Sequence, residues 1–367
     1  MESADVVVVG GGAVGAATAF HLAGLGITDV VLVERDQLAS GSTSKSAGGY
    51  RAQFADELNI RVALRSIAEL ERFDELTGVD IGLRRCGYLF LLDSEADLCA
   101  FRGAVALQNS LGVPTVELDV AEVERLVPQV DVTGLVGATF CPLDGHVTPE
   151  AVVQGYASAA AARGVRIRQG CAVTDIATAN GRITAVETTR GTIQTDTVVC
   201  AAGAWSPEIG AHVGVDIPVR GERRWTFFSA GDAGFPADLP LTIDFTTSVY
   251  LCREGTGIIV GGREPSVEEY VPLAVSRFPA LADCEIQSQW WGYYEMSPDH
   301  NAIVGEARDV ERFLFATGFS GHGFQQAPAV GEHLAELVAG HEPTLDLSPF
   351  ALDRFESGGL RPEQFVI

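Results

Sequence analysis

The residues best suited to chemistry begin in a glycine-rich stretch near the start of the chain. An apolar run, Val6 to Val9, leads into Gly10-x-Gly12-x-x-Gly15, and a second apolar run ends at Glu34. Glycines at this spacing let a strand turn sharply into a helix whose N-terminus can accept a pyrophosphate, and the later acidic residue can bind a ribose. Close packing of helix on strand could also select glycine. The strand, the helix and Glu34 together favour a site for the ADP half of FAD or NAD.

A second polar stretch follows in the loop SGSTSKSAGGYR, residues 40 to 51. It is too rich in Ser and Gly for a regular element. Its hydroxyls and backbone amides would suit the phosphates and ring of a cofactor, and a plain surface loop is the alternative. Lys45 lies in this loop and is the single lysine among the 25 basic residues of the chain.

Composition limits the possible classes of protein. The chain has 367 residues, 47% of them hydrophobic, and a formal net charge of −24. This length allows two domains, and the negative charge argues against nucleic acids and anionic membranes as partners. The chain has no apolar run long enough to span a bilayer, and the first strand starts so early that no signal peptide fits before it, so we expect a cytoplasmic protein. Seven scattered cysteines without a CxxC pair predict neither a metal site nor a disulfide framework.

Strand and helix patterns alternate along the rest of the chain without an internal repeat. Helical spacing is seen over residues 56–77, and strands are expected near 88–92 and 135–140. Thr148 followed by Pro149 predicts a capped helix start, as does Ser266 with Glu269 three residues on. The sequence therefore predicts an α/β fold in which a Rossmann-like dinucleotide-binding domain is interleaved with a β-rich α+β domain.

Four stretches together resemble a known family. They are GGGAVG with Glu34, the loop SGSTSKSAGGYR, the segment VVCAAGAW, and YYEMSPDHNAIVG followed by FATGFSGHGFQQAP. In this order they resemble the D-amino-acid oxidase (DAO) superfamily of FAD-dependent oxidoreductases, and most closely its branch of sarcosine oxidase, glycine oxidase and amino-acid dehydrogenase-like proteins. The resemblance implies a glutathione-reductase-like FAD-binding domain formed by residues 1–80, 144–218 and 297–367. A substrate-binding domain would comprise residues 81–143 and 219–296.

The resemblance also implies which residues bind the cofactor FAD. Those expected along the ADP half are Gly10, Gly12, Ala13, Val14, Gly15, Glu34, Arg35 and Val173. Those expected along the rest of the cofactor are Ser42, Thr43, Ser44, Lys45, Ala47, Gly48, Gly49, Ala202, Gly203, Trp205, Gly318, Ser320, Gly321, His322, Gly323, Phe324 and Gln325.

Three positions depart from the family pattern. Gly292 stands where several members attach FAD through a cysteine, so we expect a non-covalent flavin. Ile259 and Gln325 stand where sarcosine oxidases carry lysines, the first of which promotes the reaction with oxygen. Rapid oxidase activity and sarcosine as the substrate are therefore not favoured.

Five residues are predicted to act in catalysis. Arg51 and Arg263 could bind a substrate carboxylate through paired hydrogen bonds, although either could instead pair with a structural carboxylate. Lys45 and Gln325 would polarise the flavin, with a solvated or phosphate-facing charge as the alternative for Lys45. Tyr250 would help to roof the flavin, unless it only packs in the core.

The predicted activity is FAD-dependent oxidation of a small secondary amine or α-amino acid at its C–N bond by hydride transfer to the flavin, giving an imine that water hydrolyses. The electron acceptor would be oxygen or another molecule. The alternatives are a 2-hydroxyacid dehydrogenase on the same fold, a flavin-carrying subunit that works inside a hetero-oligomer, and an NAD-dependent enzyme.

Overall fold

A six-stranded sheet organises one half of the molecule. The computed structural model describes residues 2–366. In the strand order β19-β20-β13-β2-β3-β9 all neighbours are parallel except β19 and β20. The strands are β2 (Val6–Val9), β3 (Val30–Val33), β9 (Arg166–Arg168), β13 (Val198–Cys200), β19 (Ile303–Glu306) and β20 (Phe313–Thr317).

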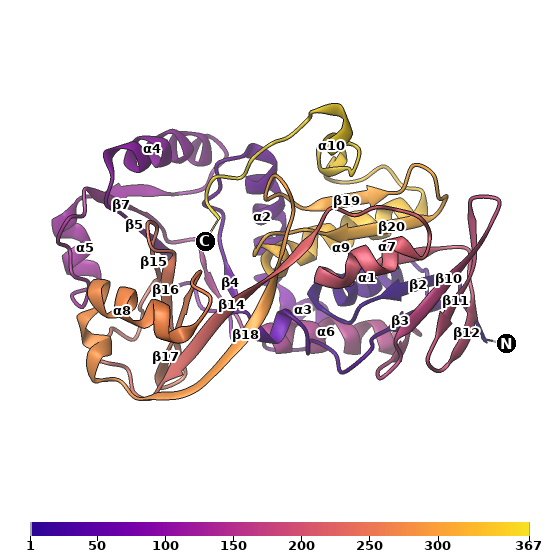
Figure 1. Cartoon of the computed structure of the whole chain (residues 1–367), viewed down its shortest axis with the longest axis horizontal. Coiled ribbons are helices and arrows are strands. Elements are labelled where there is room, and N and C mark those ends of the chain that lie inside the picture. The colour runs from indigo at the N-terminus through magenta and orange to yellow at the C-terminus, as the bar shows by residue number, and fades with distance from the viewer. Residues whose placement is uncertain (1, 367) are drawn as a thin grey trace.

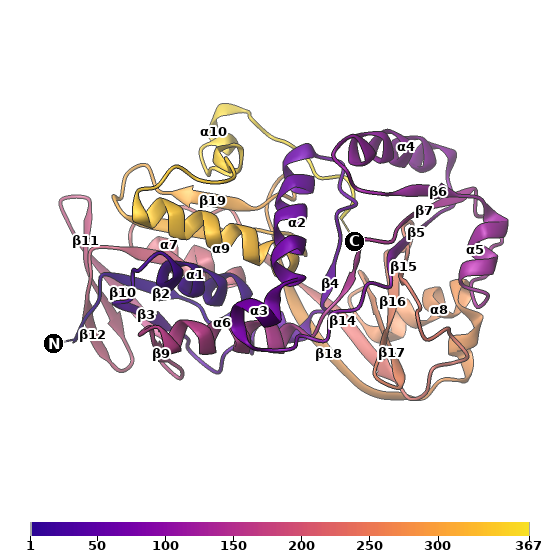
Figure 2. The same ribbon diagram turned by 180° about the vertical axis from the view of Figure 1, so that it is seen from behind.

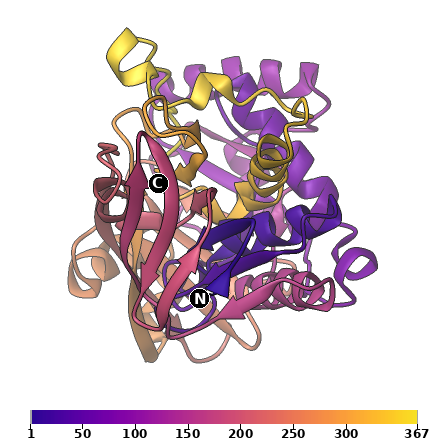
Figure 3. The same cartoon turned by 90° about the vertical axis from the view of Figure 1, so that its right-hand side faces the viewer.

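The two faces of this sheet are covered differently. Val6 and Val8 pack in a core with the helices, whereas Val7 and Val9 pack in a second core against a meander. This alternation is the period-two pattern of a strand that is buried on both faces. The helices are α1 (Ala13–Gly24), α2 (Glu57–Leu70), α6 (Pro149–Ala162) and α9 (Gly323–Ala339), which Figure 2 shows from their outer side. The meander comprises β10 (Val173–Ala179), β11 (Arg182–Thr188) and β12 (Gly191–Gln194), joined by β1 (Glu2–Ser3), and it lies nearest the viewer in Figure 3.

An eight-stranded sheet forms the other half, in the order β18-β14-β17-β16-β15-β5-β7-β6. Its helices α5 (Val120–Leu126) and α8 (Val267–Arg277) share one core with the sheet, while α4 (Glu95–Ser110) packs against the opposite face. The strands are β5 (Tyr88–Leu92), β6 (Val116–Leu118), β7 (Gly137–Cys141), β14 (Arg220–Ser229), β15 (Leu241–Asp244), β16 (Val249–Glu254), β17 (Gly257–Gly262) and β18 (Ile286–Met296).

Strands β14 and β18 connect the two halves. They pair antiparallel from Arg220 opposite Met296 to Ser229 opposite Ile286. Figure 1 shows this long ribbon running from the parallel sheet into the eight-stranded sheet. Because the partners lie opposite one another, Arg224 and Gly292 share one face of the ribbon, and Gly221 and Glu295 share the other.

Local sequence signals explain several of the helix starts. The Asp56 carboxylate accepts hydrogen bonds from the amides of Leu58 and Asn59, and the Ser266 hydroxyl accepts one from Glu269, as its spacing predicts. Helix α6 begins at Pro149 as predicted, but the Thr148 side chain makes no capping hydrogen bond, so this part of the prediction is wrong. The fixed φ of proline suits the first helical position without such a cap.

Short elements complete the chain between these larger ones. The helical segments are η1 (Thr43–Lys45), α3 (Phe73–Thr77), η2 (Gly203–Trp205), α7 (Ser206–Ala211), η3 (Pro279–Asp283), η4 (Ser348–Phe350) and α10 (Arg354–Ser357), and β4 (Gly49–Tyr50) pairs with β8 (Gly145–His146). Within residues 2–366, no helix is both long and apolar enough to cross a membrane.

The arrangement confirms the predicted fold class. A Rossmann-like α/β half with a meander is interleaved with a half built on an antiparallel-rich sheet. The predicted domain boundaries, near residues 81, 144, 219 and 297, fall in segments between named elements. The exact domain boundaries stay a prediction.

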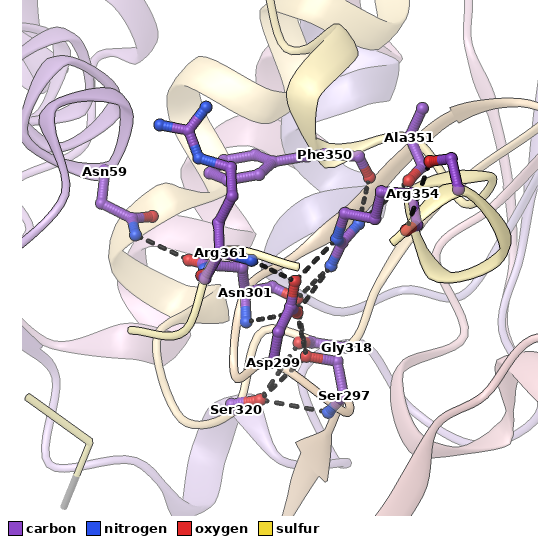
Figure 4. Close-up of polar contacts among 11 residues, drawn as sticks. Asn59, Ser297, Asp299, Asn301, Gly318, Ser320, Phe350, Ala351, Arg354 and Arg361 are labelled. Atoms are coloured by element: carbon purple, nitrogen blue, oxygen red, sulfur yellow. Dashed lines mark hydrogen bonds and ion pairs between the residues drawn. The ribbon is translucent and has the colours of Figure 1, made fainter. Parts of the chain in front are cut away.

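A buried ion pair ties the loop after β18 to the C-terminal segment. Arg354 donates to both oxygens of Asp299, from Nε at 2.8 Å and Nη2 at 2.9 Å, and their side chains are 5% and 0% exposed. Figure 4 shows Asp299 also facing the backbone of Asn301 and Arg361. Burial alone would raise the pKa of Asp299, but Arg354 and these amides outweigh burial and hold that pKa below its usual range.

Replacing Asp299 by alanine should strongly destabilise the protein. The D299A change would leave the Arg354 guanidinium buried without a countercharge, which costs about 3–5 kcal/mol of unfolding free energy. The matched control is Arg308→Ala, because Arg308 pairs with Asp353 at the surface, where ion pairs contribute little. Urea denaturation of both variants measures the difference. Equal, small effects of D299A and R308A would contradict this account of the buried pair.

Candidate functional site

A cavity of about 990 Å³ lies between the two halves of the molecule. The carboxyl ends of β2, β3, β13 and β20 border it, as expected for a ligand site on an open parallel sheet. Residues of β14, β16 and β18 close it from the other half. The cavity therefore extends from Glu34 in the parallel-sheet half to Tyr250 in the eight-stranded sheet.

The glycine motif forms an open helix N-terminus at one end of this cavity. Gly10 has φ +110°, and a Cβ there would overlap the carbonyl of Ala201, while a Cβ on Gly15 would overlap the carbonyl of Gly10. Only glycine allows these close approaches. The N-cap residue of helix α1, Gly12, has no side chain to cap the helix, and the amide of Ala13 donates to Thr43 Oγ1 at 3.2 Å. Gly12 and Val14 line the cavity, so the amides after Ala13 and the positive dipole end of α1 can receive an anionic group.

The Glu34 carboxylate is held at the same end. Its Oε2 accepts a hydrogen bond from the Gly11 amide at 2.7 Å, and its Oε1 accepts one from the Asp36 amide at 2.8 Å. An ionised carboxylate has four lone-pair positions, so two amides leave room for the hydroxyls of a ribose. Arg35 stacks on Trp205, with its guanidinium carbon 3.8 Å from the ring centroid. Val173 lines this part of the cavity as well.

The Ser/Gly-rich loop forms one wall. The Ser42 hydroxyl donates to the carbonyl of Tyr293 at 2.8 Å, and the Trp290 indole donates to the carbonyl of Lys45 at 3.1 Å. A Cβ on Gly292 would lie 2.7 Å from Cβ of Lys45, so the lysine stem covers this glycine. These bonds fix the loop against β18.

Most of the residues predicted to bind a cofactor line this one cavity. Four of them do not: Gly15, Ser44, Gly48 and Gly318. Gly48 has φ +71°, and a Cβ there would overlap the carbonyl of Val147, so a structural reason for glycine exists at that position. Of the five predicted catalytic residues, Arg51, Lys45, Gln325 and Tyr250 line the cavity, and Arg263 does not.

Arg51 is buried and has hydrogen-bonding partners within the protein. Its guanidinium donates to the carbonyls of Gln53 and Phe365, and its Nη2 lies 3.0 Å from Nε2 of His322. Burial lowers the pKa of His322 well below its usual range, and Arg51 lowers it further, so the imidazole is neutral and can accept from Arg51. Gln325 is fixed as well, since its Oε1 accepts from the Arg51 amide at 2.7 Å. Arg263 is exposed, with its guanidinium 3.4 Å from the carbonyl of Val366.

Arg224 is a basic residue of the cavity wall that was not among the residues predicted from the sequence. It lies on β14 beside Gly292 of β18, and its guanidinium carbon is 5.1 Å from the centroid of Tyr294. Burial raises the pKa of Tyr294, and Arg224, Arg51 and Arg263 oppose that rise. The alternating pattern of residues 220–229 could have placed Arg224 on the same face as Thr226, which also lines the cavity. Three guanidinium groups therefore act on Tyr294, and one of them, that of Arg224, is paired with Glu222 at 3.1 Å.

The cavity wall also contains a carboxyl group that the sequence reasoning missed. Glu295 faces the ends of β13 and β20, where its Oε2 lies 2.8 Å from Oγ1 of Thr317. Its position could not be predicted from local sequence, because its partners come from segments distant in sequence. Among residues 2–366, no group of three or more His, Cys, Asp or Glu side chains could hold a metal ion.

Known proteins resemble this chain in sequence and in fold. The family model described as "FAD dependent oxidoreductase" matches residues 5–337. Mouse mitochondrial sarcosine dehydrogenase is 29% identical over 96% of this chain, which spans only 42% of that relative's length. Bovine FAD-dependent oxidoreductase domain-containing protein 1 is 31% identical, with 100% of this chain and 87% of that protein covered.

Solved structures show the same fold. The L-proline dehydrogenase of P. horikoshii superposes with a TM-score of 0.92 at 32% identity, covering 98% of this chain and 100% of that one. Glycine oxidase from Geobacillus kaustophilus superposes with a TM-score of 0.86 at 26% identity, covering 96% and 99%.

Replacing Gly12 by a larger residue should weaken cofactor binding without unfolding the protein. Gly12 has φ −81°, which any residue can adopt, and its Cβ position is open except for Thr43 Oγ1 at 3.3 Å. We expect Gly12→Val to fill the approach to α1 and to weaken FAD binding about tenfold or more, which corresponds to about 1.4 kcal/mol. Titration of the flavin-free protein with FAD, followed by flavin fluorescence, measures this change.

The control for this variant is Gly24→Ala at the other end of the same helix. A Cβ on Gly24 has no heavy atom within 4 Å, and alanine favours the helix. G24A should bind FAD as the unmodified chain does. Unchanged FAD affinity in a folded G12V variant would contradict the placement of the pyrophosphate at α1.

Proposed function

Because the chain belongs to the family of FAD-dependent oxidoreductases, we propose that it oxidises the C–N bond of a small secondary amine or α-amino acid to an imine, which water then hydrolyses. The match confirms the family and the cofactor predicted from the sequence. The observation that carries the proposal is the continuous cavity, in which the ADP end leads to a chamber lined by Tyr250, Tyr294 and Arg224. Such a chamber suits a small carboxylated amine held against the cofactor.

The residues around the cavity fit FAD. The open N-terminus of α1 would hold the pyrophosphate, Glu34 the adenosine ribose, and the segment from Ser320 to Gln325 the flavin ring. When bound, FAD supplies the acceptor for a hydride from the substrate carbon. Gly292 offers no thiol for attachment, and Lys45 covers it, which supports a non-covalent flavin.

We assign orientation of the substrate mainly to the arginines. A guanidinium binds a carboxylate through two parallel hydrogen bonds. The donors of Arg51 are partly engaged by Gln53 and Phe365, so Arg51 shapes the positive field. Arg224 Nη1 and Nη2 contact the carbonyl of Arg223 and the carboxylate of Glu222, but its buried Nε has no hydrogen-bond partner among the described residues. Arg224 therefore keeps one free donor on the cavity wall, and we assign it the contact with the substrate. Arg263 would add to this field from outside the cavity.

Other side chains would exclude water and polarise the cofactor. Tyr250 lies over Gly261 and, with Trp290, forms an apolar roof that keeps bulk water from the reacting atoms. The carbonyl of Gln325 is fixed by the Arg51 amide, so its NH₂ group is the part left to polarise the cofactor. His322 Nε2 accepts from Arg51, so it is not free to take a proton from the substrate. Lys45 would place its charge along the cofactor.

The relatives support the amine class. Two are named for sarcosine and L-proline, which are both secondary amines with a carboxylate, and one for glycine. The chain spans less than half of the sarcosine dehydrogenases, so further domains or partners could complete those activities. For this chain we propose an acceptor other than oxygen, because Ile259, in place of an oxygen-promoting lysine, is 7% exposed and packed in the sheet. A partner subunit that accepts the electrons is consistent with this proposal.

Adding amines without oxygen should bleach the bound flavin. We expect N-methylglycine, L-proline or a primary amino acid to remove the visible flavin absorption, because the chamber places a carboxylated amine beside the ring. Admitting air should restore the absorption slowly, and an artificial dye acceptor should restore it quickly. A flavin that is bleached only by 2-hydroxyacids would contradict the amine proposal, and fast reoxidation by air would contradict the proposed acceptor.

The same titration tests the substrate contact at Arg224. Arg224→Gln should raise the concentration of carboxylated amine needed for half-bleaching by about tenfold or more, the loss of about 1.4 kcal/mol of binding. Arg223→Gln is the matched control, because Arg223 lies next along β14, is exposed and stacks on Trp291 outside the proposed contact. An equal effect of R223Q and R224Q would contradict the assignment.

A further inference from the structure

Glu295 is a half-buried acid on the cavity wall that the proposed oxidation does not use. It lies on β18 opposite Gly221 of β14 and lines the cavity at the carboxyl ends of β13 and β20. A Cβ on Gly203 would be 3.6 Å from its Oε2. Gly203 and the segment from Ser320 to Gln325 belong to the cavity wall that fits FAD. The carboxyl is therefore wedged between two segments that would border the cofactor.

The hydrogen bonds around Glu295 allow two proton states. Thr317 Oγ1 lies 3.0 Å from the carbonyl of Gly203 and 2.8 Å from Oε2 of Glu295. A hydroxyl carries only one hydrogen. If Thr317 donates to Gly203, then Glu295 must be protonated to donate to Thr317. If Thr317 donates to Glu295, the carboxyl can be ionised and the Gly203 carbonyl keeps only the Ser206 amide as a donor.

The surroundings balance these two states. Burial raises the pKa of Glu295, while the Thr317 hydroxyl and the amides of Gly318 and Phe319 lower it, with a net value of about 7. At neutral pH, both states are therefore accessible to this carboxyl.

Few other charged groups face this carboxyl. On β14, Arg220 and Glu222 flank Gly221 and so point to the opposite face of the ribbon, as Tyr294 does on β18. From β13 the thiol of Cys200 faces it, and burial raises the pKa of that thiol to about 11, so it stays neutral. From η2 and the loop after β20, the neighbours Trp205 and Ser320 carry no charge, and His322 is neutral.

We propose that Glu295 takes up a proton from water when the bound flavin is reduced, so that the carboxyl and Thr317 form a redox-linked proton switch. A hydride brings the flavin two electrons and one proton, which adds negative charge to the cavity. Like charges in a site of low dielectric disfavour one another, so the carboxylate accepts a further proton and forms an O–H bond. The Thr317 hydroxyl then turns from Glu295 to the carbonyl of Gly203. Reoxidation releases the same proton to water.

The inference makes Glu295 a positioning residue, because it acts through charge on the cofactor. It rests on the proposed function only in that FAD must bind and be reducible. The test therefore uses dithionite as reductant, so that failure of the amine chemistry would not affect it.

The experiment measures the flavin midpoint potential of the FAD-loaded protein between about pH 6 and pH 9. Across the interval in which Glu295 changes state, the unmodified protein should bind one more proton per two electrons than Glu295→Gln. This adds about 30 mV per pH unit to the slope of its midpoint potential against pH. A pH-indicator dye in weakly buffered solution should count the additional proton directly. Equal slopes and equal proton uptake in the two proteins would overturn the proposal.

A second variant keeps the test decisive if E295Q fails to fold or to bind FAD. Thr317→Val removes the hydroxyl but keeps the volume and the carboxyl, so the ionised form of Glu295 loses a donor. The pH interval over which the midpoint potential changes more steeply should then move to higher pH. In the unmodified protein, infrared difference spectra should show a protonated carboxyl band on reduction, and T317V should shift it. The proposal would also be overturned if the midpoint potential of T317V were steepest over the same pH interval as in the unmodified protein and no carboxyl band appeared on reduction.

Discussion

The close approach of three backbone segments at Gly10 is the constraint on which the site depends. The end of β2 touches the segment after β13, and the first turn of α1 touches Gly10, at distances that a side chain would prevent. These contacts bring the strand ends and the open N-terminus of α1 to one point. An anionic cofactor can then be neutralised by backbone amides, in a protein whose own charge is strongly negative. Without this convergence the cavity would have no ADP end.

The ribbon of β14 and β18 depends on that arrangement and completes it. Its two faces border different parts of the cavity, because side chains alternate along each strand. One face presents Arg224 and Tyr294 to the chamber proposed for the substrate. The other face places Glu295 against the ends of β13 and β20. A single pair of strands therefore connects the chamber proposed for the substrate with the cavity wall that fits the cofactor.

Local signals made much of the fold and the ADP end predictable. The glycine spacing with Glu34, the proline at the start of α6 and the Ser266 cap all act within a few residues or one βαβ unit. The predicted capping bond of Thr148 is wrong because proline already fixes that turn. The surroundings of Arg51 could not be foreseen, since its partner Phe365 lies far away in sequence. Arg224 and Glu295 were not predicted as site residues for the same reason, because strand pairing and tertiary contacts determine where they lie.

The most direct test of the central claim is the choice of cofactor. The account requires one continuous site that binds both the ADP half and the flavin half. Titration of the flavin-free protein should show one FAD bound per chain and released intact on denaturation. FMN, which lacks the ADP half, should bind at least about 100-fold more weakly, a difference of about 2.7 kcal/mol. FMN binding as tight as FAD, or displacement of FAD by NAD at similar concentration, would contradict the account.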